Sequence, residues 1–462
     1  MALAVATFAA VIAQSSASAD TLMGALAQAY QNNPQLNAQR TAVRASDETV
    51  PQALAGYRPR VNLSASLSSQ YLDNRNKSNG VGAAAVYTNE RGVQAVQSYG
   101  ATVNQPLLNG NQTASRTRQA EQLVSAARET LRLTEQTVLL AAATAYMNLI
   151  RDTAIFELQR LNIVVLQTQL RQAVARFEVR EITRTDVAQA ESRLSAGRSS
   201  ALTAESNYTT ARSTYRQTIG AEPGKLEPAS PVDRLSPNTL SGGIAEARLA
   251  HPSVITAMFN VDAATLQVKI AESSLYPTLG IVGSATKTYG STSSVTILET
   301  LNASISGQLS VPVYQGGSEY SLIRQAKETL TQRRIDLETA RDQVQQTVVQ
   351  SWAQLVAAKA QIESNQAQVA AAEVVLLGVS EEARVGQRTT LDVLNAQQEL
   401  VNARVSLVTG QRDRVVASYT LLAATGRLSA RNLSLAVPIY DPAVHYHQVR
   451  DSWIGVHTPD GK

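Results

Sequence analysis

The 462-residue sequence contains no cysteine, and only 5% of its residues are aromatic. The absence of cysteine fits an oxidising compartment, where stray thiols are a liability. The low aromatic content disfavours a large globular core. Ala, Gln, Ser, Thr and Val are abundant instead. Small residues and straight-chain polar residues suit long helices that pack closely along their length.

Clustered charge and catalytic motifs are also lacking. The net charge of +4 is spread along the chain, with no run of five basic residues, so nucleic acid is not an expected partner. No nucleophile, base and orienting residue occur together, and no glycine-rich loop could hold a phosphate. We therefore predict that the protein is not an enzyme, takes no cofactor and cannot bind ATP. His445, His447 and His457 are predicted to lie in a solvated tail rather than to bind a metal.

Long apolar runs are missing as well. No stretch of 18 uninterrupted apolar residues occurs, so the sequence predicts no transmembrane helix. The amino terminus is apolar from Ala2 to Ala13, and Ala17-Ser18-Ala19 has the small-x-small form of a cleavage site. Residues 1–19 are predicted to be a secretory signal peptide. The n-region is unusual, since no Lys or Arg lies between Met1 and the apolar run. A buried helix of the mature protein is the alternative.

What the sequence does contain is a duplication. Asn33-Pro34 and Pro59 recur 218 positions later as His251-Pro252 and Pro277. From Pro106 onward the offset is 206, because the first copy has about 12 extra residues near 73–97. Matched positions include Arg118 and Arg324, Tyr146 and Trp352, Asp186 and Asp392, and Gly220 and Gly426. We predict two structural repeats, residues 20–230 and 231–430, and a carboxyl-terminal tail at 431–462.

Each repeat contains two segments that alternate apolar and polar residues. Val61, Leu63, Ala65 and Leu67 alternate with polar residues in the first repeat, as do Leu279, Ile281, Gly283 and Ala285 in the second. A second alternating run follows in each copy, which predicts β-hairpins at about 57–108 and 275–314. Strands of 10 to 14 residues are expected. Ten residues, tilted near 45°, reach about 23 Å, the height of an outer-membrane apolar band.

Four strands cannot close a barrel with room inside, and an open sheet edge in lipid would leave costly unpaired backbone groups. Strands in a membrane would therefore have to be shared between copies of the chain. Three copies give 12 strands, an even number within the range of bacterial barrels. The predicted fold class is an α+β membrane protein, with four transmembrane strands per protomer and long coiled-coil helices.

The helical segments are long, and no proline interrupts residues 107–221 or 313–437. Helices are predicted at about 22–55 and 240–274, each broken at Pro34 or Pro252. Longer helices at 111–180 and 317–386 carry apolar residues at heptad spacing, beginning at Val124 and at Leu330. Each turns near 180–184 or 386–389 and returns as a shorter helix. This gives helical hairpins at about 111–220 and 317–426.

The helical turns carry a family resemblance. The first turn reads Thr183-Arg184-Thr185-Asp186-Val187, the second reads Thr389-Thr390-Leu391-Asp392-Val393, and the last helix ends in Tyr419-Thr420-Leu421-Leu422-Ala423-Ala424-Thr425-Gly426. With the duplicated hairpins, residues 20–430 resemble the TolC family of outer-membrane efflux and type I secretion channels. The tail, from Tyr440 to Gly455, resembles that of alphaproteobacterial members.

The resemblance implies a homotrimer with one 12-stranded barrel in the outer-membrane lipid and a helical tunnel across the periplasm. It also implies a periplasmic adaptor (membrane fusion) protein and an inner-membrane transporter of the ABC or RND type. A trimeric coiled-coil surface adhesin and a periplasmic scaffold are the alternatives. An adhesin would confine its strands to the carboxyl terminus, whereas strands are predicted here in both repeats.

The resemblance further implies a gate at the periplasmic tips of the helical hairpins. The gate candidates are Asp392, Asn395, Arg388 and Asp186, and the candidate contacts for an adaptor are Arg180, Arg184, Arg384 and Gly386. Asn395 stands where a second carboxylate often stands in the family, so weaker block by multivalent cations is expected.

Simpler explanations exist for several of these residues. Asp186 and Asp392 could merely cap helices, and the arginines could merely form a solvated surface. Because Arg180 occupies the position that matches Gly386, the first tip is expected to turn differently from the second. Tyr57, Tyr71, Tyr276 and Tyr289 are predicted near strand ends, either in an interfacial aromatic belt or in ordinary packing.

Overall fold

The computed structural model describes residues 21–79, 85–291 and 299–459. The predicted signal peptide at 1–19 lies outside the described residues. The chain divides into two compact units. Unit 1 contains the described residues up to Ala42, together with Arg128–Thr256 and Glu338–Asp441, and unit 2 contains those of Val43–Ala127, Ala257–Leu337 and the segment from Pro442 onward. Each unit therefore draws on both sequence repeats.

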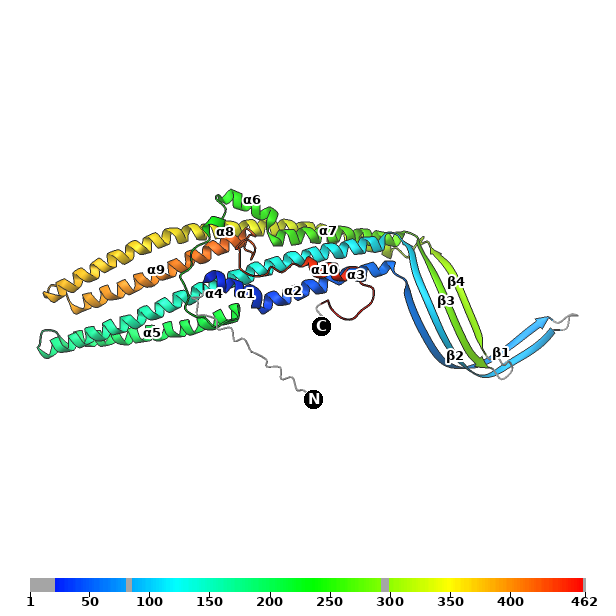
Figure 1. The fold of residues 1–462 in the computed structure, drawn as a ribbon, viewed down its shortest axis with the longest axis horizontal. Coiled ribbons are helices and arrows are strands. Elements are labelled where there is room, and N and C mark those ends of the chain that lie inside the picture. The colour runs from blue at the N-terminus through cyan, green and yellow to red at the C-terminus, as the bar shows by residue number, and fades with distance from the viewer. Residues whose placement is uncertain (1–20, 80–84, 292–298, 460–462) are drawn as a thin grey trace, which may run out of the picture. The chain divides into compact units, whose positions relative to one another are not determined.

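Unit 2 contains a four-stranded antiparallel sheet in the order β1-β2-β3-β4 (Figure 1). The strands are β1 (Arg60–Asn79), β2 (Ala85–Asn109), β3 (Thr278–Ser291) and β4 (Thr300–Ser310). Two hairpins were predicted, and β2 pairs with β3 to join them into one sheet. The expected length of 10 to 14 residues was wrong for the first hairpin, whose strands have 20 and 25 residues. The extra residues near 73–97 lengthen both of its strands.

One face of this sheet is apolar and exposed. The pairing aligns Val61 with Val103, Gly283 and Ile305 in one row across the four strands. Leu63 begins the next row on the same face, and Leu63 and Ile305 are 83% and 85% exposed. The intervening row is polar and includes a hydrogen bond of 2.9 Å between the hydroxyls of Ser284 and Ser304. A contiguous exposed apolar face marks a surface that contacts lipid or protein.

Each repeat opens with a short helical segment that proline divides. In the first, α1 (Leu22–Asn32) is followed by α2 (Pro34–Asp47), α3 (Thr49–Leu54) and the 3-10 turn η1 (Ala55–Tyr57). In the second, α6 (Leu240–Ala250) is followed by α7 (Pro252–Glu272) and η3 (Ser273–Leu275). The predicted breaks are confirmed, since Pro34 and Pro252 each begin a helix. Proline is suited to that position because it has no N–H to leave unpaired.

The longest elements are α4 (Gln112–Glu178) and α8 (Ser318–Arg384), with 67 residues each. In unit 1 they turn back into α5 (Arg184–Ile219) and α9 (Thr390–Ala424), so that two helical hairpins result (Figure 1). The heptad residues Val124, Leu131, Val138 and Ala145 of α4 are all buried. Burial at this spacing is typical of coiled-coil packing. Within the described residues, no helix combines the length and apolar character needed to cross a membrane.

The tail contains a further helix, α10 (Ala443–Val449), in unit 2. The prediction of a solvated tail was wrong for His445, which is only 8% exposed. Its Nδ1 lies 3.0 Å from a carboxylate oxygen of Asp47, a residue that is fully buried. A buried carboxylate needs hydrogen-bond partners, and His445 supplies one.

Candidate gate at the helical tips

The two tips of unit 1 have the same backbone turn. Gly386 has φ +81°, and Arg180 at the matching position has φ +64°. A backbone hydrogen bond between residues three positions apart closes each turn. Arg180 N–H donates to the Phe177 carbonyl (2.9 Å), and Gly386 N–H donates to the Ala383 carbonyl (3.3 Å). The expectation that the first tip turns differently was therefore wrong. The hydrogen bonds of the turn hold Arg180 in a left-handed conformation that costs an L-residue roughly 1–2 kcal/mol.

Each returning helix begins with a capping box. The Asp392 carboxylate accepts from the Thr389 amide (3.0 Å) and hydroxyl (2.9 Å), and the Asp392 amide donates back to that hydroxyl (3.2 Å). Asp186 and Thr183 make the same three bonds at 2.9, 2.7 and 3.3 Å. Capping is thus established for both aspartates.

The capping bonds also keep both carboxylates charged. The pKa of Asp392 is lowered chiefly by the backbone hydrogen bond from Thr389, and that of Asp186 chiefly by the Thr183 hydroxyl. Hydrogen bonds donated to a carboxylate favour its ionised form. Each tip therefore presents a negative charge at neutral pH, as a cation-sensitive gate would require.

An ion pair spans each turn, with its polarity reversed between the two tips. In the first, Arg176 on the helix lies 3.0 Å from Glu181 in the turn. In the second, Glu382 on the helix lies 2.9 Å from Arg388 in the turn. The Glu382 hydrogen bond is the main reason that the pKa of Arg388 is raised. Both pairs are exposed, so solvent screens them and each contributes little to stability.

The remaining arginine candidates lie at the exposed surface of the tips. Arg384 pairs with Glu381 on its own helix at 3.0 Å. Arg180 and Arg184 are exposed as well. An open cleft of about 590 Å³ between the hairpins is lined by residues of both, including Arg176, Glu181 and Arg384. The structure thus brings basic residues of both tips to one cleft. The sequence showed only that arginines are frequent near the two turns.

Asn395 connects the two hairpins instead of standing alone. Its side-chain oxygen accepts a hydrogen bond of 2.7 Å from the Arg193 guanidinium of α5. The neighbouring Leu394 is buried in a cluster that includes Leu166 of α4 and Leu194 of α5. Asn395, at the position where family members often have a second carboxylate, therefore lies against the positive charge of Arg193. Sequence reasoning missed Arg193, because nothing in its own segment indicates a partner 202 positions away.

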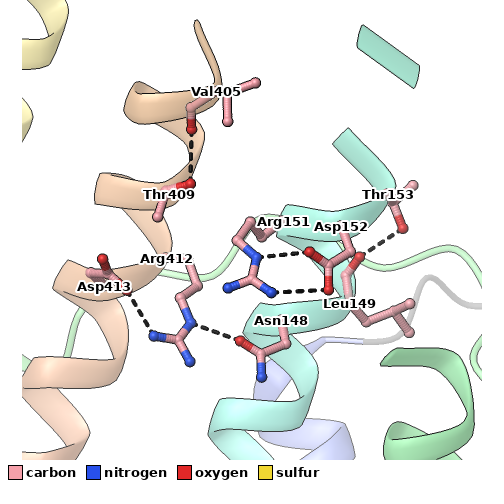
Figure 2. Close-up of polar contacts among 9 residues, drawn as sticks. All are labelled: Asn148, Leu149, Arg151, Asp152, Thr153, Val405, Thr409, Arg412 and Asp413. Carbon is pink, nitrogen blue, oxygen red and sulfur yellow. Dashed lines mark hydrogen bonds and ion pairs between the residues drawn. The ribbon is translucent and has the colours of Figure 1, made fainter. Parts of the chain in front are cut away.

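A second polar connection between the hairpins lies farther along the helices. Figure 2 shows Arg412 of α9 reaching Asn148 of α4, with 2.8 Å between its Nε and the amide oxygen. Arg412 also contacts the adjacent Asp413 at 2.7 Å, while Arg151 makes two bonds to the buried Asp152. Of these contacts, the Arg412–Asn148 hydrogen bond joins the two hairpins, while the other two link neighbouring residues of one helix. Among the described residues, no cluster of three or more His, Cys, Asp or Glu side chains could hold a metal.

Comparisons with known proteins extend over both repeats. The family described as outer membrane efflux protein matches residues 25–221 and 243–427. The chain is 40% identical over 452 residues to the outer membrane efflux protein BepC of Brucella suis biovar 1 (strain 1330), which covers 98% of this chain and 95% of that protein. It is 25% identical over 435 residues to the outer membrane protein TolC of Escherichia coli (strain K12), with 90% and 84% covered. Its fold is similar to that of the Campylobacter jejuni CmeC outer membrane channel, with a TM-score of 0.75 over 93% of this chain and 89% of that one at 15% identity.

Proposed function

Because the chain belongs to the outer membrane efflux protein family, we propose that three copies form an exit duct for small molecules, secreted proteins or both. Membership of this family confirms the family resemblance that the sequence of the helical turns indicated. It identifies an efflux protein of the outer membrane, not an enzyme, an adhesin or a scaffold. The proposal adds the trimer, the extension of the helices into the periplasm, and the partners: a periplasmic adaptor and an inner-membrane transporter of the ABC or RND type.

The observation that carries the trimer is the open sheet. In the described part of the chain, β1 pairs with β2 alone and β4 with β3 alone, so both edges of the sheet lack a neighbouring strand. Lipid offers no hydrogen bonds to such edges, and each unpaired group costs several kcal/mol. Pairing β1 of one copy with β4 of the next satisfies both edges.

The polar face of the sheet supports a duct. The face opposite the apolar rows carries Asn62, Thr102, Ser284 and Ser304 in one row. Small uncharged polar residues suit a water-filled lumen, while the apolar face turns to lipid. Two copies would give eight strands, whose interior is filled by side chains or one small ligand. Three copies are the smallest number that leaves a lumen.

The tips supply the gate and the adaptor contact in this proposal. Asp392, with Arg388 beside it, forms one acidic ring in the trimer, and Asn395 and Asp186 lie in its surroundings. Arg180, Arg184, Arg384 and the turn at Gly386 face the adaptor. The energy for transport comes from the inner-membrane transporter.

Engineered disulfides test the shared barrel directly, because the natural chain has no cysteine. Asn62→Cys on β1 is combined in turn with Ser304→Cys, Ser306→Cys or Gln308→Cys on β4, all on the polar face. We expect at least one combination to give a covalent ladder that ends at a trimer on non-reducing gels. The four single-cysteine variants, treated identically, are the controls and stay monomeric. A ladder in none of the combinations, or one that continues beyond three copies, would rule out the proposed trimer.

A further inference from the structure

The carboxyl-terminal tail contains an exposed apolar segment, which we call the tail segment (Ser452–Val456). Trp453 is 67% exposed, and Ile454 and Val456 are 95% and 92% exposed. Scattered exposed apolar residues are ordinary, but three within four positions form a patch. The patch is in unit 2, the unit that contains the sheet.

Arg58 holds the tail segment against the entry to the first strand. Its Nη1 donates a hydrogen bond of 2.6 Å to the Ser452 carbonyl. Its guanidinium also lies over the Trp453 ring, 4.6 Å from the ring centroid. Arg58 follows η1 directly, and only Pro59 separates it from the start of β1 at Arg60. One side chain therefore fixes both the backbone of the tail segment and its aromatic ring beside the sheet.

The attachment point lies at the base of the apolar face. The Gln105 side chain donates to the Tyr57 carbonyl at 3.0 Å, and Gln105 pairs with Ile281 in the sheet. Other exposed aromatic residues flank the same ends of the strands, Tyr276 just before β3 and Tyr314 just after β4. Val61 and Leu63, the first exposed apolar residues of β1, follow three and five positions after Arg58.

The opposite end of the apolar face also has an aromatic pair. The rings of Tyr99 and Tyr289 meet edge to face at 6.3 Å. Tyr276 and Tyr289 are 13 positions apart in the sequence. At about 3.3 Å per residue and a tilt near 40°, they are roughly 30 Å apart along a membrane normal, the thickness of a bilayer hydrocarbon core. Aromatic residues at both ends of an apolar band are typical of the two membrane interfaces.

We propose that the tail segment is a lipid-binding element that extends the apolar face of the sheet along the membrane interface. The Trp453 ring lies at headgroup level, Ile454 and Val456 reach the acyl boundary, and the exposed Arg60 at the start of β1 contacts lipid phosphates. The partner is the phospholipid leaflet at the base of the strands. The continuity of the segment with the exposed face of β1 favours lipid over a second copy of the chain.

Tryptophan fluorescence tests this, because Trp352 and Trp453 are the only tryptophans of the chain. Full-length Trp352→Phe protein is reconstituted into phosphatidylethanolamine and phosphatidylglycerol vesicles that contain phospholipid brominated near the headgroup end of the acyl chains. We expect Trp453 to lose roughly half of its emission or more, as a ring at the interface should. Lipid brominated near the chain ends should quench it less. Ile454→Ser with Val456→Ser should shift the emission to longer wavelength and reduce the quenching.

The reciprocal variant Trp453→Phe keeps Trp352, which packs beside Leu355 and Leu421 in unit 1, and should not be quenched. If Trp352→Phe does not fold, the difference between wild type and Trp453→Phe gives the same signal. Water-like emission without quenching would place the tail segment in solvent and overturn the proposal. Blue-shifted emission without quenching would show that protein covers it, and would also overturn the proposal while leaving the trimer intact.

Discussion

At the residue scale, the two repeats place different side chains in the same role. Asn33 begins α2 by accepting hydrogen bonds at its side-chain oxygen from the amides of Gln35 (2.9 Å) and Leu36 (3.3 Å). At the matching position, His251 Nδ1 accepts from the Ser253 amide at 3.2 Å and contacts the Ser253 hydroxyl at 2.7 Å. An imidazole can cap in this way only while it is neutral at Nδ1.

His251 therefore predicts a pH-dependent stability. Desolvation lowers the pKa of His251 from 6.5 to about 4, and the nearby Arg132 charge adds to the shift. The unfolded chain takes up the proton below pH 6.5 while the folded chain does not, so stability falls as the pH drops from 6.5 toward 4. At pH 5 the loss is about 2 kcal/mol relative to pH 7. The measurement is the denaturation midpoint of the purified protein at the two pH values.

The first repeat provides the matched replacement. His251→Asn keeps a capping oxygen but has no titrating group, so the fall between pH 7 and pH 5 should shrink by about 2 kcal/mol relative to wild type. Asn33→His should introduce a similar loss of stability between pH 7 and pH 5, provided that the site of residue 33 excludes water as the site of His251 does. Equal pH dependence in wild type and His251→Asn would contradict the role of His251.

At the element scale, helix ends were predictable and inter-hairpin contacts were not. Thr183 and Thr389 mark helix starts because their hydroxyls and the following aspartates form local capping boxes. The sequence within a few residues is sufficient for that. The link from Arg193 to Asn395 depends on how two hairpins pack, so neither segment contains a signal for it. The long strands of the first hairpin were missed because their extra residues have no counterpart in the second repeat.

Close packing of the second hairpin leads to a prediction about two glycines. A Cβ at Gly410 of α9 would lie 2.9 Å from the side-chain nitrogen of Asn365, whereas a Cβ at Gly378 of α8 meets no atom of the chain within 4 Å. Asn365 cannot move easily, since it is buried, donates to the Ser406 carbonyl at 2.9 Å and accepts from Gln361 at 2.8 Å.

Gly410→Ala should therefore destabilise the protein although alanine favours helix. The gain in helix propensity is about 1 kcal/mol, and disturbing a buried hydrogen-bonded amide costs about 1–3 kcal/mol. We expect a net loss of about 1 kcal/mol, measured by chemical denaturation. Gly378→Ala is the matched control and should gain up to about 1 kcal/mol. The double variant Asn365→Ala with Gly410→Ala should lose less stability than the sum of the losses in the two single variants. A loss equal to that sum would mean that the contact between the two residues is unimportant.

At the scale of the whole molecule, the duplication and the proposed threefold axis set the charge of the gate. In the proposed trimer each copy would contribute one Asp392, which would give a ring of three carboxylates at that level. Asn395 is the position at which a second ring could be built. Its contact with Arg193 at 2.7 Å means that a carboxylate placed there would meet a positive charge on the same copy.

This contact separates two variants that would otherwise look alike. Asn395→Asp alone should strengthen block by a trivalent cation only modestly, because Arg193 partly neutralises the new carboxylate. Combined with Arg193→Gln, the second ring keeps its full charge, and we expect the blocking constant to tighten by about tenfold or more relative to wild type, about 1.4 kcal/mol. Single-channel conductance in planar bilayers is the measurement, with Arg193→Gln alone as the control that should leave block unchanged.

Tight block of the wild type, or equal block in all four proteins, would show that these positions do not line the constriction. If Asp392→Asn also leaves the cation sensitivity of the conductance unchanged, the gate does not lie at the second tip.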